Sequence, residues 1–410
     1  MKQYVIIGNG VAAAGCIEGI RSVDTESKIT VVSEEKHAVY CRPLISYYLE
    51  GKTTPTRMNY RSADFYEKTG CDVLYGLSAT SIDTAAKAVV LNNGTKLPYT
   101  ALCVAAGSTP FVPPFEGIDT VENKFSFMTL DDALSLEKAV NQNSRVLIVG
   151  AGLIGLKCAE GLRDRVASIT VCDLADRVLS SILDSECAER VQKHLEANGI
   201  RFMLGDSAVR FTKNAAQMKS GKTVDFDVLV LAVGVRANTA LVKEIGGAVN
   251  RGILVDEKMQ TTAAAVFAAG DCTEGEDVSF GQKRVLALLP NAYMQGHTAG
   301  VNMAGGNEVF DKAIPMNSIG FFGLHVMTAG TYDGEMYEEK SENTLKRLFT
   351  KDGLLKGFIL IGNTERAGIY TSLIREKTPL DTIDFETMKR VATCAAFSCE
   401  NRRKKFGGVV

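Results

Sequence analysis

The chain has 410 residues, of which 46% are hydrophobic and 23% are charged, and its formal net charge is -2. These values are ordinary for a globular protein, and the length predicts two or three domains. The near-neutral charge excludes the basic footprint of a nucleic-acid-binding protein, and we interpret the one basic cluster, residues 402–405, as a solvated tail.

Because no targeting signal is recognised in the sequence, we expect a cytoplasmic protein, and the cysteine usage agrees with this expectation. No stretch approaches the ~20 apolar residues of a membrane span, and the first strand begins too early for a signal peptide. The ten cysteines are therefore expected to be reduced. The chain contains no C-x-x-C pair and only four scattered histidines, so we expect no metal site.

The first predicted strand, at residues 4–7, runs directly into a Gly-rich turn. In this turn Gly8 permits the tight bend, Gly10 lets the backbone approach a pyrophosphate, and Ala13 keeps the following helix close to the strand. An apolar, β-branched run before such a turn is typical of a buried parallel strand. The motif reads Gly8-Asn9-Gly10-Val11-Ala12-Ala13.

The elements after this turn complete a nucleotide-binding unit. A helix over about 11–22 points its positive end at the phosphates. A second strand at 29–32 leads to Glu34 and Glu35. Either carboxylate is at the spacing expected for accepting the ribose hydroxyls of a dinucleotide.

A second fingerprint follows the apolar run at 146–149. The helix after it is expected to reach about Arg165, and the next strand, at 168–172, ends at Asp173. A carboxylate here accepts a ribose 2′-hydroxyl and repels a 2′-phosphate, which favours NADH over NADPH, although Arg177 could soften that preference. The motif reads Gly150-Ala151-Gly152-Leu153-Ile154-Gly155. Two such units in one chain predict two nucleotides held against each other.

Two more strands end in turns of small residues. One leads into Ala105, Ala106 and Gly107, and the other into Gly270 and Asp271. An Asp at a strand end beside a helix N-terminus can accept a hydrogen bond from a ribityl hydroxyl. From about residue 315 the pattern becomes α+β, with strands predicted at 318–322, 325–329, 345–350 and 354–361 and helices near 366–376 and 385–396.

In combination these motifs resemble the three-domain FAD/NAD(P) reductases of the pyridine nucleotide–disulfide oxidoreductase superfamily. The resemblance implies an α/β fold with two Rossmann-like, three-layer ββα domains and a C-terminal α+β interface domain. It places an FAD-binding domain at 1–112 and 235–314, an NAD-binding domain at 113–234 and the interface domain at 315–410. The matching pieces are 8–13, 105–107, 150–155, 231–238 and 269–271.

The resemblance also implies which residues bind each cofactor. The first fingerprint binds FAD, to which Asp271 returns, and the second binds NADH. The helix that contains Ala292 directs its N-terminus at the flavin pyrimidine ring. The other residues assigned to FAD are Val11, Ala12, Ala79, Ala106, Gly107 and Gly270, and those assigned to NADH include Leu153, Ile154 and Gly234.

Whether the chain has a redox-active thiol depends on the loop that contains Cys41. Glutathione-reductase-type enzymes carry C-x-x-x-x-C on this loop, and NADH oxidases, NADH peroxidases and coenzyme A disulfide reductases use a single cysteine there. The segment around Cys41 instead resembles the Tyr-x-Arg-Pro-x-Leu-Ser pattern of rubredoxin, ferredoxin and nitrite-reductase-type flavoreductases, where Cys41 takes the variable position. In that pattern Arg42 contacts FAD and Pro43 stiffens the turn. We expect a passive thiol, with a catalytic Cys41 as the alternative.

Lys157 reverses the charge of the Glu that resembling proteins often carry at this position. Ferredoxin reductases have Lys where this chain has Tyr47. We interpret the pair as a compensated exchange, in which Lys157 acts in catalysis by orienting the nicotinamide amide or stabilising anionic reduced flavin. The alternative is an ordinary exposed helix lysine.

The sequence therefore predicts an FAD-dependent NAD(P)H oxidoreductase. Hydride passes between NADH and flavin, and electrons pass to or from a protein carrier, which is rubredoxin, ferredoxin or an iron–sulfur partner subunit. One alternative is an NADH oxidase, peroxidase or coenzyme A disulfide reductase that uses Cys41. The other is a non-catalytic flavoprotein subunit, and a homodimer is also left open.

Overall fold

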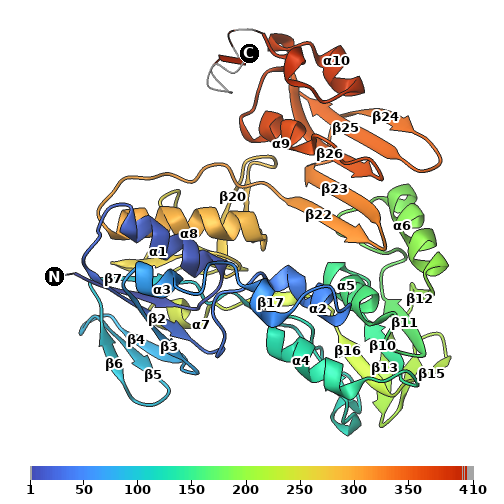
Figure 1. Ribbon diagram of the computed structural model, residues 1–410, viewed down its shortest axis with the longest axis horizontal. Helices are drawn as coiled ribbons and strands as arrows, with labels where there is room; N and C mark the ends of the chain where they lie inside the picture. Colours follow the sequence, from blue (N-terminus) through green and yellow to red (C-terminus); the bar gives the residue numbers. More distant parts are fainter. Residues whose placement is uncertain (1, 399, 401, 404–410) are drawn as a thin grey trace.

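A computed structural model of the protein describes residues 2–398, 400, 402 and 403. Lys404 and Lys405 of the basic run lie outside the described residues. The fold is α/β, with parallel sheets in the first two thirds of the chain and an antiparallel sheet near the C-terminus (Figure 1). Within the described part, every helix is too short or too polar to traverse a lipid bilayer.

The first sheet is fully parallel and has the strand order β19-β7-β1-β2-β3. Its strands are apolar because both faces are covered, by helices on one side and by the small antiparallel sheet β4-β5-β6 on the other (Figure 1). The strands are β1 Gln3–Ile7, β2 Lys28–Ser33, β3 Cys71–Tyr75, β7 Ala101–Val104 and β19 Val266–Ala268, with β4 Ala79–Asp83, β5 Ala88–Leu91 and β6 Lys96–Pro98.

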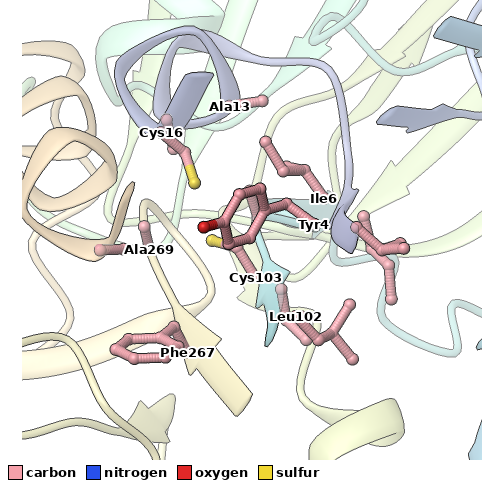
Figure 2. Close-up of a cluster of buried hydrophobic side chains, with 14 of the residues drawn as sticks. Tyr4, Ile6, Ala13, Cys16, Leu102, Cys103, Phe267 and Ala269 are labelled. Atoms are coloured by element: carbon pink, nitrogen blue, oxygen red, sulfur yellow. The ribbon is translucent and has the colours of Figure 1, made fainter. Parts of the chain in front are cut away.

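Helices α1 (Val11–Arg21) and α8 (Leu289–Met303) run parallel and in close contact above this sheet (Figure 1). Glycines make the approach possible, since a Cβ on Gly15 would clash with the carbonyl of Tyr293, and one on Gly300 with that of Cys16. Figure 2 shows the core beneath α1, where Cys16 faces Tyr4 and Cys103. This packing directs the N-termini of both helices toward the same edge of the sheet.

The second sheet repeats the first, with the parallel order β12-β11-β10-β16-β9. Helices α4, α5 and α6 and the antiparallel sheet β13-β14-β15 accompany it. The bounds are β9 Lys124–Phe125, α4 Leu130–Ala139, β10 Arg145–Val149, α5 Leu153–Leu162, β11 Ser168–Asp173, α6 Ser185–Ala197, β12 Ile200–Leu204, β13 Ala208–Thr212, β14 Ala215–Met218, β15 Thr223–Asp225 and β16 Val228–Leu231. Helix α5 ends three residues before the predicted Arg165, in a turn that closes on Leu162.

The chain crosses between these two units twice, and the crossings lie side by side. Strand β8 (Ser108–Pro110) pairs antiparallel with β17 (Val235–Ala237). The boundaries at 112/113 and 234/235 fall beside this pair, and the domain division stays a prediction. The other short elements are α2 Ile45–Leu49, α3 Phe65–Lys68, α7 Ala240–Glu244, β18 Ile253–Leu254, β20 Thr273–Asp277 and β21 Gln282–Arg284.

The C-terminal part contains an antiparallel sheet of order β22-β23-β26-β25-β24, accompanied by helices α9 (Ala367–Arg375) and α10 (Phe385–Arg390). The sequence missed β24 because this exposed edge strand is rich in charge and lacks an apolar run. The predicted helix over 385–396 was too long, since it ends at Arg390, where Val391 is extended. The strands are β22 Met316–Phe321, β23 Leu324–Gly330, β24 Glu335–Lys340, β25 Leu345–Lys351 and β26 Leu354–Ile361.

Candidate nucleotide sites

The first glycine turn leaves open space at the N-terminus of α1. Gly8 has a φ of 105°, and a Cβ there would clash with the carbonyl of Ala105 at the end of β7. Gly10 precedes the first residue of α1 in an extended conformation, and a Cβ on it would meet no atom within 4 Å. Ala13 is fully buried against the strand. The free helix N–H groups therefore face a space that can accept an anion.

Residues far apart in the sequence converge on this turn. A Cβ on Gly270 would lie 3.0 Å from the Cβ of Ala12 and 3.6 Å from that of Ala292. The backbone N–H of Gly270 donates to the side chain of Gln295 on α8 (2.8 Å). Gln295 was not predicted as a site residue, because α8 also contains Asn291, His297, Thr298 and Asn302 and no pattern sets Gln295 apart from them.

Asp271 follows Gly270 and lies close to Arg42. Burial raises the pKa of the Asp271 carboxyl, and the nearby Arg42 guanidinium opposes that rise. In the described part of the chain this carboxyl makes no hydrogen bond. It is thus a half-buried acceptor without a protein donor, which fits a role in binding a hydroxyl of a ligand.

The structure distinguishes the two carboxylates considered for the ribose. Glu34 is exposed immediately after β2. Glu35 is engaged, since one oxygen accepts from Arg42 and the other from the Tyr40 hydroxyl (2.7 Å). Arg42 also donates to the carbonyl of Met128 (3.3 Å). The Glu35 carboxylate is therefore occupied by protein donors and the exposed Glu34 carboxylate is not, while the assignment of either one to the ribose stays a prediction.

Tyr40, the Tyr of the Tyr-x-Arg-Pro pattern, has contacts that were not predicted from the sequence. Its hydroxyl accepts from the backbone N–H of Leu130 at the start of α4 (2.9 Å) and from Arg42 (3.2 Å). The loop expected to contact FAD is thereby joined to the second unit. Pro43 lies inside the short 3-10 turn Arg42–Leu44, as its fixed φ allows.

The remaining residues assigned to FAD lie on neighbouring strand ends. Ala79 begins β4 and is partly buried against the hydrophobic core of the first parallel sheet. Asn238 tethers the turn after β7, donating from its side chain to the carbonyl of Ala106 (2.8 Å) and from its backbone to Gly107 (3.0 Å). Their contacts with a cofactor stay predictions.

The second glycine turn repeats the geometry of the first. Gly150 has a φ of 117°, and a Cβ on it would clash with the carbonyl of Ala232 at the end of β16. A Cβ on Gly152 would meet no atom within 4 Å, whereas one on Gly155 would clash with the carbonyl of Gly150. Leu153 and Ile154 form the first turn of α5 directly beyond this open space.

Asp173 lies at the end of β11 and holds the second turn in place. Its carboxylate accepts from the backbone N–H of Ala151 (2.7 Å) and of Ala175 (2.8 Å). Arg177 is engaged by Asp176 (2.8 Å) and by the carbonyl of Leu183 (3.2 Å). Gly234, with a φ of 111°, lies in the turn between β16 and β17.

A family model for pyridine nucleotide-disulphide oxidoreductases matches residues 2–296, which include both glycine turns and Asp271. The chain belongs to this family. The protein is accordingly an oxidoreductase that uses FAD and NAD(P)H.

Two relatives and one solved structure are similar to this chain over most of its length. The chain is 32% identical over 391 residues to the NADH-dependent phenylglyoxylate dehydrogenase subunit epsilon of Aromatoleum evansii, covering 92% of both chains. It is 31% identical to the NADH oxidase of Methanocaldococcus jannaschii, covering 88% of this chain and 87% of the relative. The putidaredoxin reductase in a covalent complex with putidaredoxin has the same fold, with a TM-score of 0.88, 21% identity and coverage of 96% and 97%.

The passive role expected for Cys41 stays a prediction, and two observations bear on it. Burial raises the pKa of the Cys41 thiol, and a thiolate is the reactive form of cysteine. The backbone N–H of Cys41 donates to the carbonyl of Met58 (2.8 Å), which fixes the loop.

In the described part of the chain, no three His, Cys, Asp or Glu side chains are grouped so that they could hold a metal ion.

The raised pKa of Cys41 predicts how its alkylation depends on pH. Because the neutral thiol dominates below the folded-state pKa, the thiolate forms only above the ordinary thiol value of about 8.5. The iodoacetamide reaction at the Cys41 peptide, followed by mass spectrometry, should still accelerate as the pH rises beyond about 8.5. A rate that levels off at or below neutral pH would instead reveal an activated thiolate.

Lys157 lies where three parts of the chain meet. Its ammonium group is 4.8 Å from the ring centroid of Tyr47 and donates to the carbonyl of Gly320 (3.1 Å). It also pairs with the buried Glu160, whose second oxygen accepts from the N–H of Phe322 (2.6 Å). The side chain is only 17% exposed, so the alternative of an exposed helix lysine is wrong. The contact with Tyr47 agrees with the compensated exchange, and the catalytic role stays a prediction.

Proposed function

We propose that the protein transfers hydride between NADH and FAD and exchanges electrons with an iron–sulfur protein partner. The observation that carries this proposal is the repeated glycine turn, in which Gly10 and Gly152 each open a helix N-terminus to a phosphate group. The proposal assigns FAD to residues 1–112 and 235–314, and NADH to residues 113–234.

The residues around the first turn fit FAD. The N-terminus of α1 binds the pyrophosphate, Glu34 accepts from the ribose, and the half-buried Asp271 offers an acceptor to a ribityl hydroxyl. The N-terminus of α8 places partial positive charge where negative charge develops on the pyrimidine ring. When bound, FAD supplies the hydride acceptor and the step from two-electron to one-electron transfer.

Asp173 supports a preference for NADH over NADPH. Its carboxylate holds the glycine turn and has lone pairs left for a ribose hydroxyl, whereas a 2′-phosphate would be repelled. We expect Asp173→Asn to lower kcat/KM for NADH about tenfold and to narrow the gap to NADPH. Asp164→Asn, at an exposed position after α5, is the matched control and should change neither the kcat/KM for NADH nor the ratio of NADH to NADPH activity. Equal effects of both substitutions would contradict the role of Asp173.

The partner is inferred from the loop at Cys41 and from one relative. A thiol with a raised pKa does not favour an internal disulfide acceptor. The relative from Aromatoleum evansii is named as one subunit of an NADH-dependent dehydrogenase, which supports a partner subunit as donor or acceptor. The relative named NADH oxidase favours oxygen as a second candidate acceptor. Homodimerisation stays a prediction.

The test uses the FAD-loaded protein, wild type and Cys41→Ser, reduced anaerobically by NADH. Rubredoxin, a plant-type ferredoxin, oxygen, peroxide and coenzyme A disulfide are then supplied in turn. We expect reoxidation by an iron–sulfur or rubredoxin carrier to be equally fast in both proteins. Turnover with peroxide or coenzyme A disulfide that disappears in Cys41→Ser would contradict the proposal and establish the thiol mechanism.

A further inference from the structure

We propose that Tyr332 and Arg347, in the C-terminal part of the chain, are positioning residues for NADH. They hold the segment 174–184, which follows Asp173 and supports the second glycine turn. The inference rests on the proposed function, in which that turn binds NADH.

The segment 174–184 is attached directly to the glycine turn. Ala151, the second residue of the turn, donates its N–H to Asp173 and accepts at its carbonyl from the N–H of Leu179 (2.9 Å). Leu179 has a φ of 50°, a conformation that is unfavourable for a bulky side chain, and it is buried. Such a conformation persists only where the surroundings impose it, so the position of Ala151 depends on what holds this segment.

Tyr332 holds the middle of the segment from the C-terminal part. Its hydroxyl donates to the carbonyl of Ile182 (2.7 Å), and its ring lies 5.1 Å from that of Phe349. Burial raises the pKa of Tyr332 to about 12, so the hydroxyl stays protonated and able to donate throughout the neutral range. Ile182 in turn donates its own N–H to the carbonyl of Leu179 (2.9 Å).

Arg347 fixes the end of the same segment. Its side chain is 7% exposed and pairs with Asp184 (2.6 Å), Glu338 (2.7 Å) and Glu186. Asp184 also caps α6 by accepting from the N–H of Cys187 (2.9 Å). One carboxylate therefore joins the segment, the start of α6 and the C-terminal sheet.

This arrangement predicts that changes at Tyr332 or Arg347 alter NADH binding and not hydride transfer. Between its fixed points the segment exposes Leu174, which is 71% exposed and adjoins the ribose-binding candidate Asp173. The polar contacts of Tyr332 and Arg347 are with this segment, with the start of α6 and with strand β24. Loosening the segment should thus weaken NADH binding and leave hydride transfer from bound NADH unchanged.

The experiment compares two conservative changes in the C-terminal part of the FAD-loaded protein. Tyr332→Phe removes only the hydroxyl that reaches Ile182. Tyr337→Phe, on the neighbouring strand β24, is the matched control because its hydroxyl makes no hydrogen bond to the segment. We expect Tyr332→Phe to raise KM for NADH about fivefold to tenfold, with kcat and FAD content unchanged. Arg347→Lys, which keeps the charge but loses the forked contacts, should act in the same direction.

The outcomes are distinguishable from failure of the proposed function itself. If NADH does not reduce the flavin of the wild-type protein, the proposed function fails. If it does, and both Tyr variants have the wild-type KM, the inference is wrong. A fall in kcat at unchanged KM, or loss of FAD from Tyr332→Phe, would also overturn it.

Discussion

Gly152→Val is expected to fold, to bind FAD normally and to lose reduction by NADH. A Cβ at this position meets no protein atom within 4 Å, and the backbone is in an extended conformation that Val adopts readily. The added side chain occupies the space beside the N-terminus of α5 where the pyrophosphate must approach the backbone. The loss of NADH affinity should be on the order of 100-fold or more, about 2.7 kcal/mol.

The measurement is anaerobic stopped-flow reduction at increasing NADH concentration, read from the flavin absorbance. The variant should unfold within about 3 °C of the wild-type temperature, because no core contact changes. If the folded variant is reduced with wild-type KM, the second glycine turn is not the NADH site.

Gly10→Val should give the complementary result, a folded protein that lacks FAD. The geometry is the same, since a Cβ on Gly10 also meets no atom within 4 Å and precedes the first residue of α1. Here the blocked space is that of the FAD pyrophosphate. We expect FAD affinity to fall on the order of 100-fold, so that the purified protein is colourless.

The two glycine variants control each other. An analogue of NADH that cannot donate hydride is the binding probe. Its binding, measured by calorimetry, should persist in Gly10→Val and be lost in Gly152→Val. FAD content should show the opposite pattern. A variant that loses both ligands would indicate general damage to the fold, and exchanged patterns would reverse the assignment of the two sites.

The glycine turns could be predicted from the sequence because each position has a local steric reason. Gly8 and Gly150 need a positive φ beside a carbonyl, while Gly10 and Gly152 leave space at a helix N-terminus. The carboxylates at the end of the second strand of each unit, Glu34 and Asp173, could be predicted because they lie at a short, regular distance in sequence from the glycine turn. The parallel sheets could be predicted for a similar reason, since their strands are continuous apolar runs.

Contacts across large sequence distances could not be predicted in this way. The hydroxyl of Tyr332 and the carbonyl of Ile182 are 150 residues apart, and no periodicity links them. The engagement of Glu35 by Arg42 and Tyr40 separates two adjacent carboxylates that the sequence treats as equivalent. The contacts of Glu160 could not be predicted either. Its carboxylate binds Lys157 and the backbone N–H of Phe322, which only the folded chain brings together.

The most direct test of the central claim is an anaerobic titration of the FAD-loaded protein with NADH. The claim is that NADH reduces the flavin through the two glycine-turn sites and that no thiol stores electrons. Full bleaching of the flavin should then need about one equivalent of NADH per FAD, since one hydride carries the two electrons that the flavin accepts. A requirement for about two equivalents, which Cys41→Ser reduces to about one, would contradict the account.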